Sequence, residues 1–414
     1  MSLNHHAGRM SGRDPHEAHR AATPLELLFD LTFVVAFSQV STQTAHYLEI
    51  GDLTTAFGGF AFTIFGATWA WINYSWLASA YDNDDVFFRL ATLVEMIGVI
   101  VFALGVPPAF HSIAEGEHLD NALIIAGYVV MRIAGVALWL RAARHDPAHR
   151  ATCLAYAKNI VIAQVLWIAL VIIDLPIGPT FAIAGVLILF ELAGPFWAET
   201  RHGRTPWHAH HIAERYGLLV IIALGEVVLG TILTISAGVE QYGWTMETVL
   251  LTAGAATLAF ALWWTYFSIP FGELLEAHRE RAFLFGYLHY FVFAAIVGIG
   301  AGLHTGAQVI AHDAHVDAVF AVSAVAVPVV LYEFVIFLLY ALLVGRLDPF
   351  HVWLFAGAVA MLAVAIGSVA LGASLGAGLV ILACSPVVIV VGYETVGWRH
   401  GRDLLARATA DRSH

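Results

Sequence analysis

The chain has 414 residues, of which 60% are hydrophobic and only 12% are charged, and its mean hydropathy is +0.78. Soluble domains carry about 25% charged residues, so this composition excludes an ordinary soluble protein and indicates an integral membrane protein. The formal net charge is −12, and no basic stripe with interleaved aromatic residues is present, which excludes nucleic acid as a partner.

The chain begins with a polar segment, residues 1–22, that lacks the apolar core of a signal peptide. We expect this segment to be a cytoplasmic tail, with a second short tail over residues 401–414. The two cysteines, Cys153 and Cys384, fall at or within predicted spans and form no CxxC motif. A disulfide or a thiolate metal site is therefore not expected, and no cofactor is predicted.

Between the tails the sequence predicts an all-α polytopic membrane protein of about twelve transmembrane helices, since each apolar stretch approaches the roughly 20 residues that cross a bilayer. Only the weak break LGASLG (371–376) separates the last two stretches, so the number of helices within 349–396 stays open. The expected spans are 24–48, 53–79, 86–106, 121–142, 153–173, 177–197, 211–235, 246–269, 282–304, 318–342, 350–372 and 374–396.

Loop charges predict the orientation. Lys and Arg concentrate in cytoplasmic loops. The odd-numbered loops, such as 107–121 and 304–317, contain neither residue. The tails and the even-numbered loops hold the arginines, namely Arg9, Arg13, Arg20, Arg141, Arg144, Arg150, Arg201, Arg204, Arg279, Arg281, Arg346, Arg399, Arg402, Arg407 and Arg412. We expect a multi-pass inner (plasma) membrane protein with both termini in the cytoplasm.

Two turns suggest an internal repeat. The pattern Arg-x-Asp-Pro-x-His occurs as RHDPAH at 144–149 and as RLDPFH at 346–351, 202 residues apart. Asp-Pro favours a turn and ends the preceding helix. Other matches lie at similar offsets, including RHGR at 201–204 and at 399–402. We expect two parallel six-helix repeats, 23–204 and 205–400, an arrangement known among transporters.

Ionisable residues within the spans carry the functional signal. A charge at bilayer depth costs at least ~2.5–3.5 kcal/mol on insertion scales, so it usually faces a cavity or a partner. Glu191 is one such acid, in the sixth span. The candidate proton- or substrate-binding residues are Glu26, Asp30, Arg89, Glu95, Arg132, His211, Glu214, Arg215, Glu226, His289 and Glu333.

Structural roles are an alternative for part of this set. Glu26, Arg89, Glu214 and Arg215 lie within about two turns of a predicted helix end, where capping, snorkelling or ion pairing accounts for a charge. Asp30, Glu95, Arg132, Glu226 and Glu333 lie deeper and favour a functional role.

Metal binding stays open. The acidic cluster Asp82–Asp85 (YDNDD, 81–85) fits a solvated loop better than a metal site, because no second ligand set is visible. The histidines of WHAHH (207–211) could bind a metal, but their place at a membrane boundary makes this the less favoured interpretation.

Three stretches together resemble one family. TPLELLFDLTFVVAFSQVS (23–41), the YDNDD loop leading to Arg89, and HHIAERYGLLVIIALGE (210–226) are similar to the bacterial low temperature requirement protein A (LtrA) family. The resemblance covers roughly residues 20–400. It implies an integral membrane protein and places the family's polar motif residues at Glu26, Asp30, Asp82, Arg89, His211, Glu214, Arg215 and Glu226. It does not imply a particular reaction.

Two main hypotheses for function follow. The first is a proton- or cation-linked secondary transporter with a carboxylate- and arginine-lined site between its two halves, formed by helices 1, 3, 4, 7, 9 and 10. The second is a membrane-embedded enzyme acting on a lipid or isoprenoid, which lacks a recognisable nucleophile; a membrane sensor is a third. An enzyme is therefore the less favoured interpretation. The expected partners are membrane lipids and a small molecule or ion, and a homodimer stays open.

Overall fold

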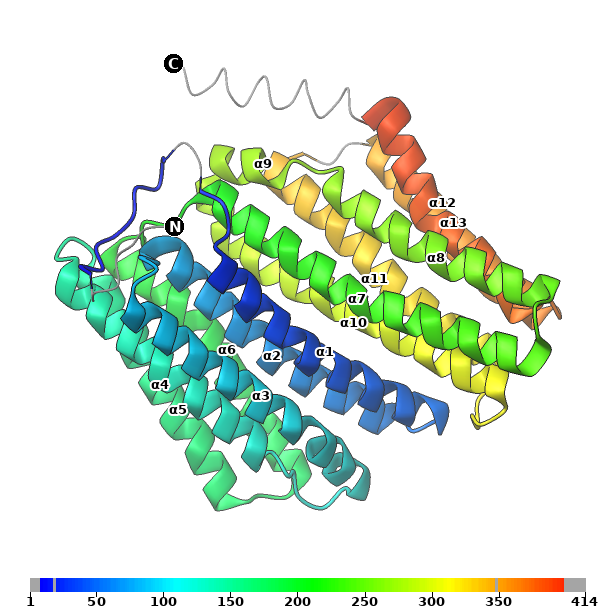
Figure 1. Cartoon of the computed structure of the whole chain (residues 1–414), viewed down its shortest axis with the longest axis horizontal. Coiled ribbons are helices and arrows are strands. Elements are labelled where there is room, and N and C mark those ends of the chain that lie inside the picture. Colours follow the sequence, from blue (N-terminus) through cyan, green and yellow to red (C-terminus); the bar gives the residue numbers. More distant parts are fainter. Residues whose placement is uncertain (1–7, 18–19, 347–348, 398–414) are drawn as a thin grey trace. The chain divides into compact units, whose positions relative to one another are not determined.

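The structure is a computed structural model that describes residues 8–17, 20–346 and 349–397 (Figure 1). Within these ranges 12 helices are long and apolar enough to cross a membrane. No strand occurs in them, apart from an isolated β-bridge between His118 and Pro176. The all-α polytopic class and the expected twelve spans are confirmed. The weak break before the last span is a real turn, since one helix ends at Ala370 and the next begins at Leu375.

The helices follow the chain with short connections, and Figure 1 carries their labels. The first half contains α1 (Pro24–Glu49), α2 (Leu53–Tyr81), α3 (Val86–Glu115), α4 (Ala122–His145), α5 (Arg150–Ile173) and α6 (Ile177–His202). The second half contains α7 (Ala209–Tyr242), α8 (Met246–Phe267), α9 (Phe271–Ala277), η1 (Arg279–Arg281), α10 (Ala282–Ala311), α11 (Ala318–Val344), α12 (Pro349–Ala370), α13 (Leu375–Gly392) and η2 (Tyr393–Gly397).

Helix α3 extends beyond its expected end. Pro107 and Pro108 suggest a loop from residue 107, but the helix continues to Glu115 and ends at Gly116, whose φ is +78°. Each proline removes one backbone hydrogen bond. Ala109 and Phe110 beyond them are fully buried, so the helix gains apolar burial that offsets this loss.

The chain divides into two compact units. Unit 1 contains Met1–Gln39 and Gly58–Arg215, and unit 2 contains Val40–Phe57 and Tyr216–His414. Helices adjacent in sequence pack together in unit 1, in the pairs α3–α4, α4–α5 and α5–α6. In unit 2 the packed pairs are α10–α11, α11–α12, α12–α13, α8–α13 and α11–α13. The two expected six-helix repeats stay a prediction. The boundaries between the two units fall within α1, α2 and α7, and not at residue 204.

Close contact between α3 and α4 depends on small residues. A Cβ built on Gly127 of α4 would lie 2.6 Å from the carbonyl oxygen of Gly98 and 2.8 Å from the Cα of Phe102, both on α3. The two backbones therefore meet directly at this level. Small residues at a helix contact allow this approach in membranes, where packing replaces the hydrophobic effect as the driving force.

The N-terminal segment packs on unit 1. Met10 is fully buried, and its N–H donates to His145 Nδ1 at 3.1 Å. The Arg13 N–H donates to the carbonyl oxygen of Ala80 at 3.0 Å. Arg20 donates from its guanidinium to the carbonyl oxygens of Ala78 and Ser79, at 2.7 and 2.6 Å. These carbonyls belong to the last turn of α2, where carbonyl groups run out of N–H partners within the helix, and the Ala78 oxygen also accepts from the Asp82 N–H at 2.9 Å.

The acidic loop between α2 and α3 is a helix cap and a tether. Asp85 is the N-cap of α3 and accepts from the Phe88 N–H at 2.9 Å. It also pairs with Arg141 of α4. Asp84 pairs with Arg89 at 2.8 Å on the exposed side. Burial disfavours a charged Asp85, but its hydrogen bonds to Arg141 and Phe88 outweigh burial and hold its pKa well below the usual range.

The first Arg-x-Asp-Pro-x-His segment forms the expected turn. Helix α4 ends at His145, and Asp146 accepts from the Ala148 N–H at 3.2 Å and contacts His149 Nδ1 at 2.8 Å. Residues 347–348 of the second segment and RHGR at 399–402 lie outside the described residues.

Replacing Gly127 with alanine tests the α3–α4 contact. We expect Gly127→Ala to lower the midpoint of thermal unfolding in detergent, because overpacking costs about 1–3 kcal/mol. Alanine's higher helix propensity returns roughly 1 kcal/mol at most. The control is Gly185→Ala on α6, where a Cβ meets nothing within 4 Å. Equal midpoints for the two variants would contradict the close contact.

Asp82 provides a pH-dependent test of the same loop. Burial raises its pKa to about 6, from the ordinary 3.8, while its Oδ1 accepts from the Asp84 N–H at 2.8 Å. The folded protein thus binds this proton more tightly than the unfolded chain does. The contribution of Asp82 to stability therefore falls as the pH rises from about 4 to about 6.

We expect Asp82→Asn to unfold at a higher temperature than the wild type above pH 6 and at the same temperature below pH 4. Thermal unfolding across this pH range measures it. The control is Asp85→Asn, which we expect to unfold at a lower temperature at neutral pH, since it weakens the Arg141 pair and the α3 cap. An Asp82→Asn variant less stable than the wild type at pH 7.5 would refute the assignment.

Candidate functional site

Four candidate residues meet inside unit 1. Arg215 of α7 contacts Asp30 Oδ1 at 2.5 Å through Nη2, and Glu26 Oε1 at 3.0 Å through Nη1. His211, one turn earlier on α7, contacts Glu26 Oε2 at 3.2 Å through Nε2. All four side chains are fully buried. We call Glu26, Asp30, His211 and Arg215 the α1–α7 cluster.

Local helix chemistry positions the acids. Thr23 and Glu26 form a capping box at the start of α1: the Thr23 N–H donates to Glu26 Oε2 at 2.8 Å, and the Glu26 N–H donates to Thr23 Oγ1 at 3.2 Å. Asp30 follows four residues later, so it lies on the same helix face. On α7, the His211 N–H donates to His208 Nδ1 at 3.2 Å. Glu26 thus both caps α1 and contributes to the cluster.

Helix α2 also contacts the α1–α7 cluster. Trp71 Nε1 donates to Asp30 Oδ1 at 2.7 Å, and Arg215 Nη2 donates to Ser75 Oγ at 3.3 Å. The Arg215 guanidinium carbon lies 5.6 Å from the Trp71 ring centre and 5.9 Å from that of Tyr74. Aromatic faces attract a guanidinium, and this attraction is stronger out of water. Trp71 and Ser75, four residues apart on one face, were not predicted as site residues.

Several polar atoms in this cluster lack hydrogen-bond partners. They are Asp30 Oδ2, Arg215 Nε and His211 Nδ1, in addition to the poorly aligned Glu26 Oε1 and Arg215 Nη1. Nearly all buried polar atoms in proteins are hydrogen-bonded, so unused donors and acceptors indicate a place for water, a proton or a ligand. The cluster also holds two carboxylates for one guanidinium. With both acids ionised and His211 neutral, it carries one excess negative charge.

A second charged group lies elsewhere in unit 1. Arg132 of α4 pairs with Glu191 of α6 at 2.8 Å, and both are nearly buried. Trp69 and Trp167 donate their indole N–H groups to Glu191, at 2.6 and 2.9 Å. Glu191 thus has three donors, and the pair is well satisfied. It ties α2, α4, α5 and α6 together.

Glu95 lies beside this pair without joining it. It is nearly buried on α3 and lines a cavity of about 20 Å³, together with Tyr74 and Arg132. A cavity of this size has room for about one water molecule. Tyr74 also contacts Thr92 Oγ1 at 3.0 Å and stacks on Phe29 of α1, with ring centres 3.7 Å apart. Tyr74 is therefore the side chain shared by this cavity and the wall of the α1–α7 cluster.

Unit 2 holds the remaining buried candidates. His289 of α10 is enclosed by aromatic rings, and its Nε2 contacts the Tyr266 hydroxyl at 2.9 Å while its Nδ1 contacts the Phe285 carbonyl oxygen at 2.8 Å. A neutral imidazole satisfies both contacts. Glu226 of α7 packs against Gly300 of α10. Glu333 of α11 is fully buried and contacts Ser385 of α13 at 2.7 Å.

Two candidates lie on the surface of the protein. Glu214 neighbours Arg215 in sequence but lies on a different, exposed face of α7. Arg89 pairs with Asp84 and remains 42% exposed. Neither joins the α1–α7 cluster. Among the described residues no group of three or more His, Cys, Asp or Glu side chains is arranged to hold a metal ion, and this includes Asp82–Asp85 and the histidines at 208–211.

Charge balance in the α1–α7 cluster can be tested by mutation. We expect Arg215→Gln to destabilise the protein by about 3–5 kcal/mol, because it leaves two carboxylates buried without a cation. Adding Asp30→Asn removes one of those carboxylates and should restore part of the loss. Thermal unfolding of the two single variants and the double variant measures this coupling. Strictly additive losses would show that the two side chains do not act as one buried unit.

Comparison with known proteins agrees with the motifs. A family model described as bacterial low temperature requirement A protein (LtrA) matches residues 21–386. A relative in Rhizobium meliloti (strain 1021), the uncharacterized protein RA0937, is 28% identical over 251 residues. That alignment covers 58% of this chain and 57% of the relative's own length. Since the family model spans most of the sequence, including the α1–α7 cluster, the chain belongs to the bacterial LtrA family and is a multi-pass membrane protein with 12 candidate spans.

Proposed function

We propose that this LtrA protein is a secondary transporter linked to protons or cations, and that the α1–α7 cluster is part of its binding site. The observation that carries the proposal is the composition of this cluster. Two fully buried carboxylates face one guanidinium, and each of the four members has at least one buried polar atom without a hydrogen-bond partner. Buried ionisable residues in membrane proteins commonly mark ion pathways and proton relays.

The charge of the cluster favours a cationic substrate. Glu26 is committed to the α1 cap and to Arg215, whereas Asp30 leaves Oδ2 free of hydrogen bonds. A proton, a metal cation or an amine bound at Asp30 would neutralise the excess negative charge. An anion would increase the negative charge in a fully buried site, which is costly. Acids exceed arginines in the spans as well, in agreement with this preference.

The contacts of each residue in and around the α1–α7 cluster indicate its role in binding. Arg215 is the fixed counter-charge that keeps both carboxylates in place. Trp71 and Ser75 orient Asp30 and Arg215 from α2. Asp30 offers an unused acceptor to the cation or proton, and His211 offers its unused Nδ1 as a second acceptor. The proposal thus uses a narrower set of residues than the sequence suggested.

The arginine distribution supports an orientation for this site. Under the positive-inside rule both termini are cytoplasmic and the protein resides in the bacterial inner membrane. Pro24, Ala209 and Tyr81, the nearby ends of α1, α7 and α2, then face the cytoplasm. At 1.5 Å per residue, Asp30 and Arg215 each lie about 9 Å from the start of their helix. The cluster would therefore lie within reach of the cytoplasmic surface.

Proton flux in everted membrane vesicles tests the transporter proposal. Vesicles with an imposed pH gradient would receive NaCl, KCl, MgCl₂ or spermidine, and a pH-sensitive dye would report the gradient. We expect at least one cation to dissipate the gradient with the wild-type protein. Asp30→Asn should reduce that response at least tenfold, because it removes the carboxylate that has an unused acceptor.

The control is Glu214→Gln, which removes an exposed carboxylate next to Arg215 and should leave the response unchanged. Expression and unfolding temperature must match among the variants. A gradient that no cation dissipates, or an Asp30→Asn protein as active as the wild type, would reject this site as the transport site.

A further inference from the structure

Glu333 is a buried candidate acid whose hydrogen-bond partner is a hydroxyl group and not a basic side chain. Its side chain is fully buried, and its Oε2 has no hydrogen-bond partner. No Lys, Arg or His forms an ion pair with it among the residues that the structure describes. At 1.5 Å per residue it lies about 22 Å from Ala318 and about 16 Å from Val344, near the middle of α11.

The number of hydrogens available for hydrogen bonds indicates whether Glu333 is protonated. Ser385 Oγ lies 2.7 Å from Glu333 Oε1 and also 2.9 Å from the carbonyl oxygen of Ala358 on α12. A serine hydroxyl has only one hydrogen, so it cannot donate fully to both acceptors. If Glu333 carries a proton, its carboxyl donates to Ser385 Oγ, and Ser385 in turn donates to Ala358. This order gives the Ser385 hydroxyl one donor and one acceptor and leaves no buried charge, while Glu333 Oε2 stays without a hydrogen-bond partner.

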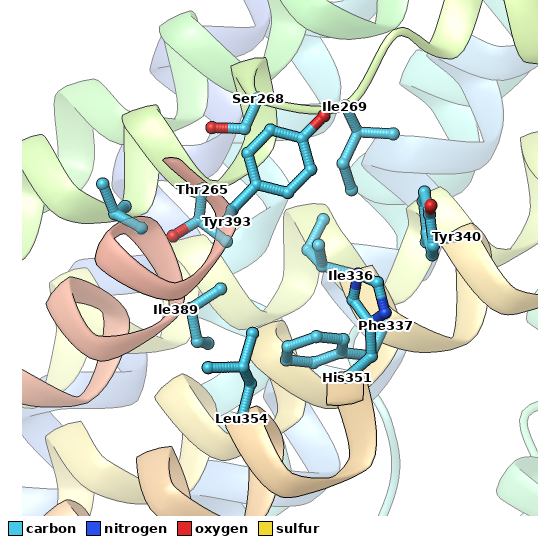
Figure 2. Close-up of a pocket in the computed structure, with 11 residues that line it drawn as sticks. Thr265, Ser268, Ile269, Ile336, Phe337, Tyr340, His351, Leu354, Ile389 and Tyr393 are labelled. Atoms are coloured by element: carbon cyan, nitrogen blue, oxygen red, sulfur yellow. The ribbon is translucent and has the colours of Figure 1, made fainter. Parts of the chain in front are cut away.

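A cavity lies one helical turn from these three residues. Its walls include Ile336 and Phe337, Leu354, and Ile389, which follow or precede Glu333, Ala358 and Ser385 by three or four residues on the same helices (Figure 2). Its volume of about 30 Å³ has room for one or two water molecules. On each of the three helices, the cavity residues lie closer than Glu333, Ala358 or Ser385 to the end of unit 2 at which α11 ends and α12 begins.

The cavity is mostly apolar, with a few polar side chains along it. Figure 2 shows Ser268 and Tyr393 in its upper part and Tyr340 and His351 to the right, with Ile336 between them and with Ile389 and Leu354 at the lower left. The titratable residues on α11 and on the elements packed around it include Tyr332 and Tyr340 of α11 itself, Glu273 and Glu276 of α9, Tyr287, His289, Tyr290 and His304 of α10, His351 of α12, Cys384 of α13, and Tyr393 and Glu394 of η2. Tyr332 donates to the Leu262 carbonyl, and His289 is held by Tyr266 and Phe285. Among the histidines of these helices, His351 is the one that lines the cavity.

We propose that Glu333 binds an exchangeable proton in the middle of unit 2, and that the cavity with His351 on its wall is the route of exchange. The proton leaves Glu333 for water in the cavity once Ile336, Leu354 and Ile389 move apart, and it returns the same way. In the proposed transporter it is the coupling proton, a role that rests on that function. The proton-binding site itself does not rest on it.

Infrared difference spectroscopy of the full-length protein in liposomes tests the proton. At pH 7 we expect a carbonyl band of a protonated carboxylic acid that shifts in D₂O and is absent in Glu333→Gln. Glutamine keeps the size of the side chain and can donate to Ser385, so this variant should fold. A spectrum in which Glu333→Gln removes only a carboxylate band would overturn the proposal.

The route is tested by filling the cavity. We expect Ile389→Phe to slow the D₂O shift of the Glu333 band at least fivefold, since the larger ring takes the space of the water. The control is Val391→Phe on the same helix, where the side chain is 53% exposed and outside the cavity. Equal exchange rates in the two variants would reject the cavity as the route.

The coupling role has its own readout. In the vesicle assay, Glu333→Gln should abolish the cation-driven loss of the pH gradient. Full activity of this variant, with the infrared band present in the wild type, would leave Glu333 a proton site without coupling. If no cation dissipates the gradient even with the wild type, the transporter proposal and the coupling role fall together, while the infrared result decides the proton site.

Discussion

Unit 1 depends on the pairing of Arg215 with two carboxylates out of contact with water. A guanidinium and two acids at 2.5 and 3.0 Å are tolerable in a membrane protein only together, because each alone would be a buried charge. The N-terminal end of α1, the first turns of α7 and the middle of α2 must therefore stay in register. The capping box at Thr23 and the packed N-terminal segment hold the same end of the unit in place.

The buried charged residues form separate groups, which differ in how many of their polar atoms have hydrogen-bond or ion-pair partners. In the Arg132–Glu191 pair each carboxylate oxygen of Glu191 accepts at least one hydrogen bond, so the pair has a structural role in holding four helices together. The α1–α7 cluster has unused acceptors and an excess acid, which suits binding. Glu333 has a hydroxyl partner and no cation, which suits a proton. One central site lined by all of these residues is therefore not needed to account for them.

The two proposals share one physical requirement. A site inside a membrane can release a proton or a cation only if the charge left behind is compensated. In the α1–α7 cluster Arg215 supplies that compensation permanently, so Asp30 can lose a cation at moderate cost. Around Glu333 no basic side chain among the described residues does so, and the carboxyl should ionise only when water enters the neighbouring cavity. The two acids are thus suited to different steps of a transport cycle.

Hydropathy and motif were enough to predict twelve spans, the family and most of the acids buried within those spans, although not Glu199, because these properties depend on residues close together in the sequence. The helix at Pro107 was missed because burial of Phe110 outweighed a local stop signal. Which charges meet was decided only by tertiary structure. Arg215 and Asp30 are 185 residues apart, whereas Glu214 beside Arg215 points away. An ion pair depends on distance in space and on the loss of water around it, and neither is set by position in the sequence.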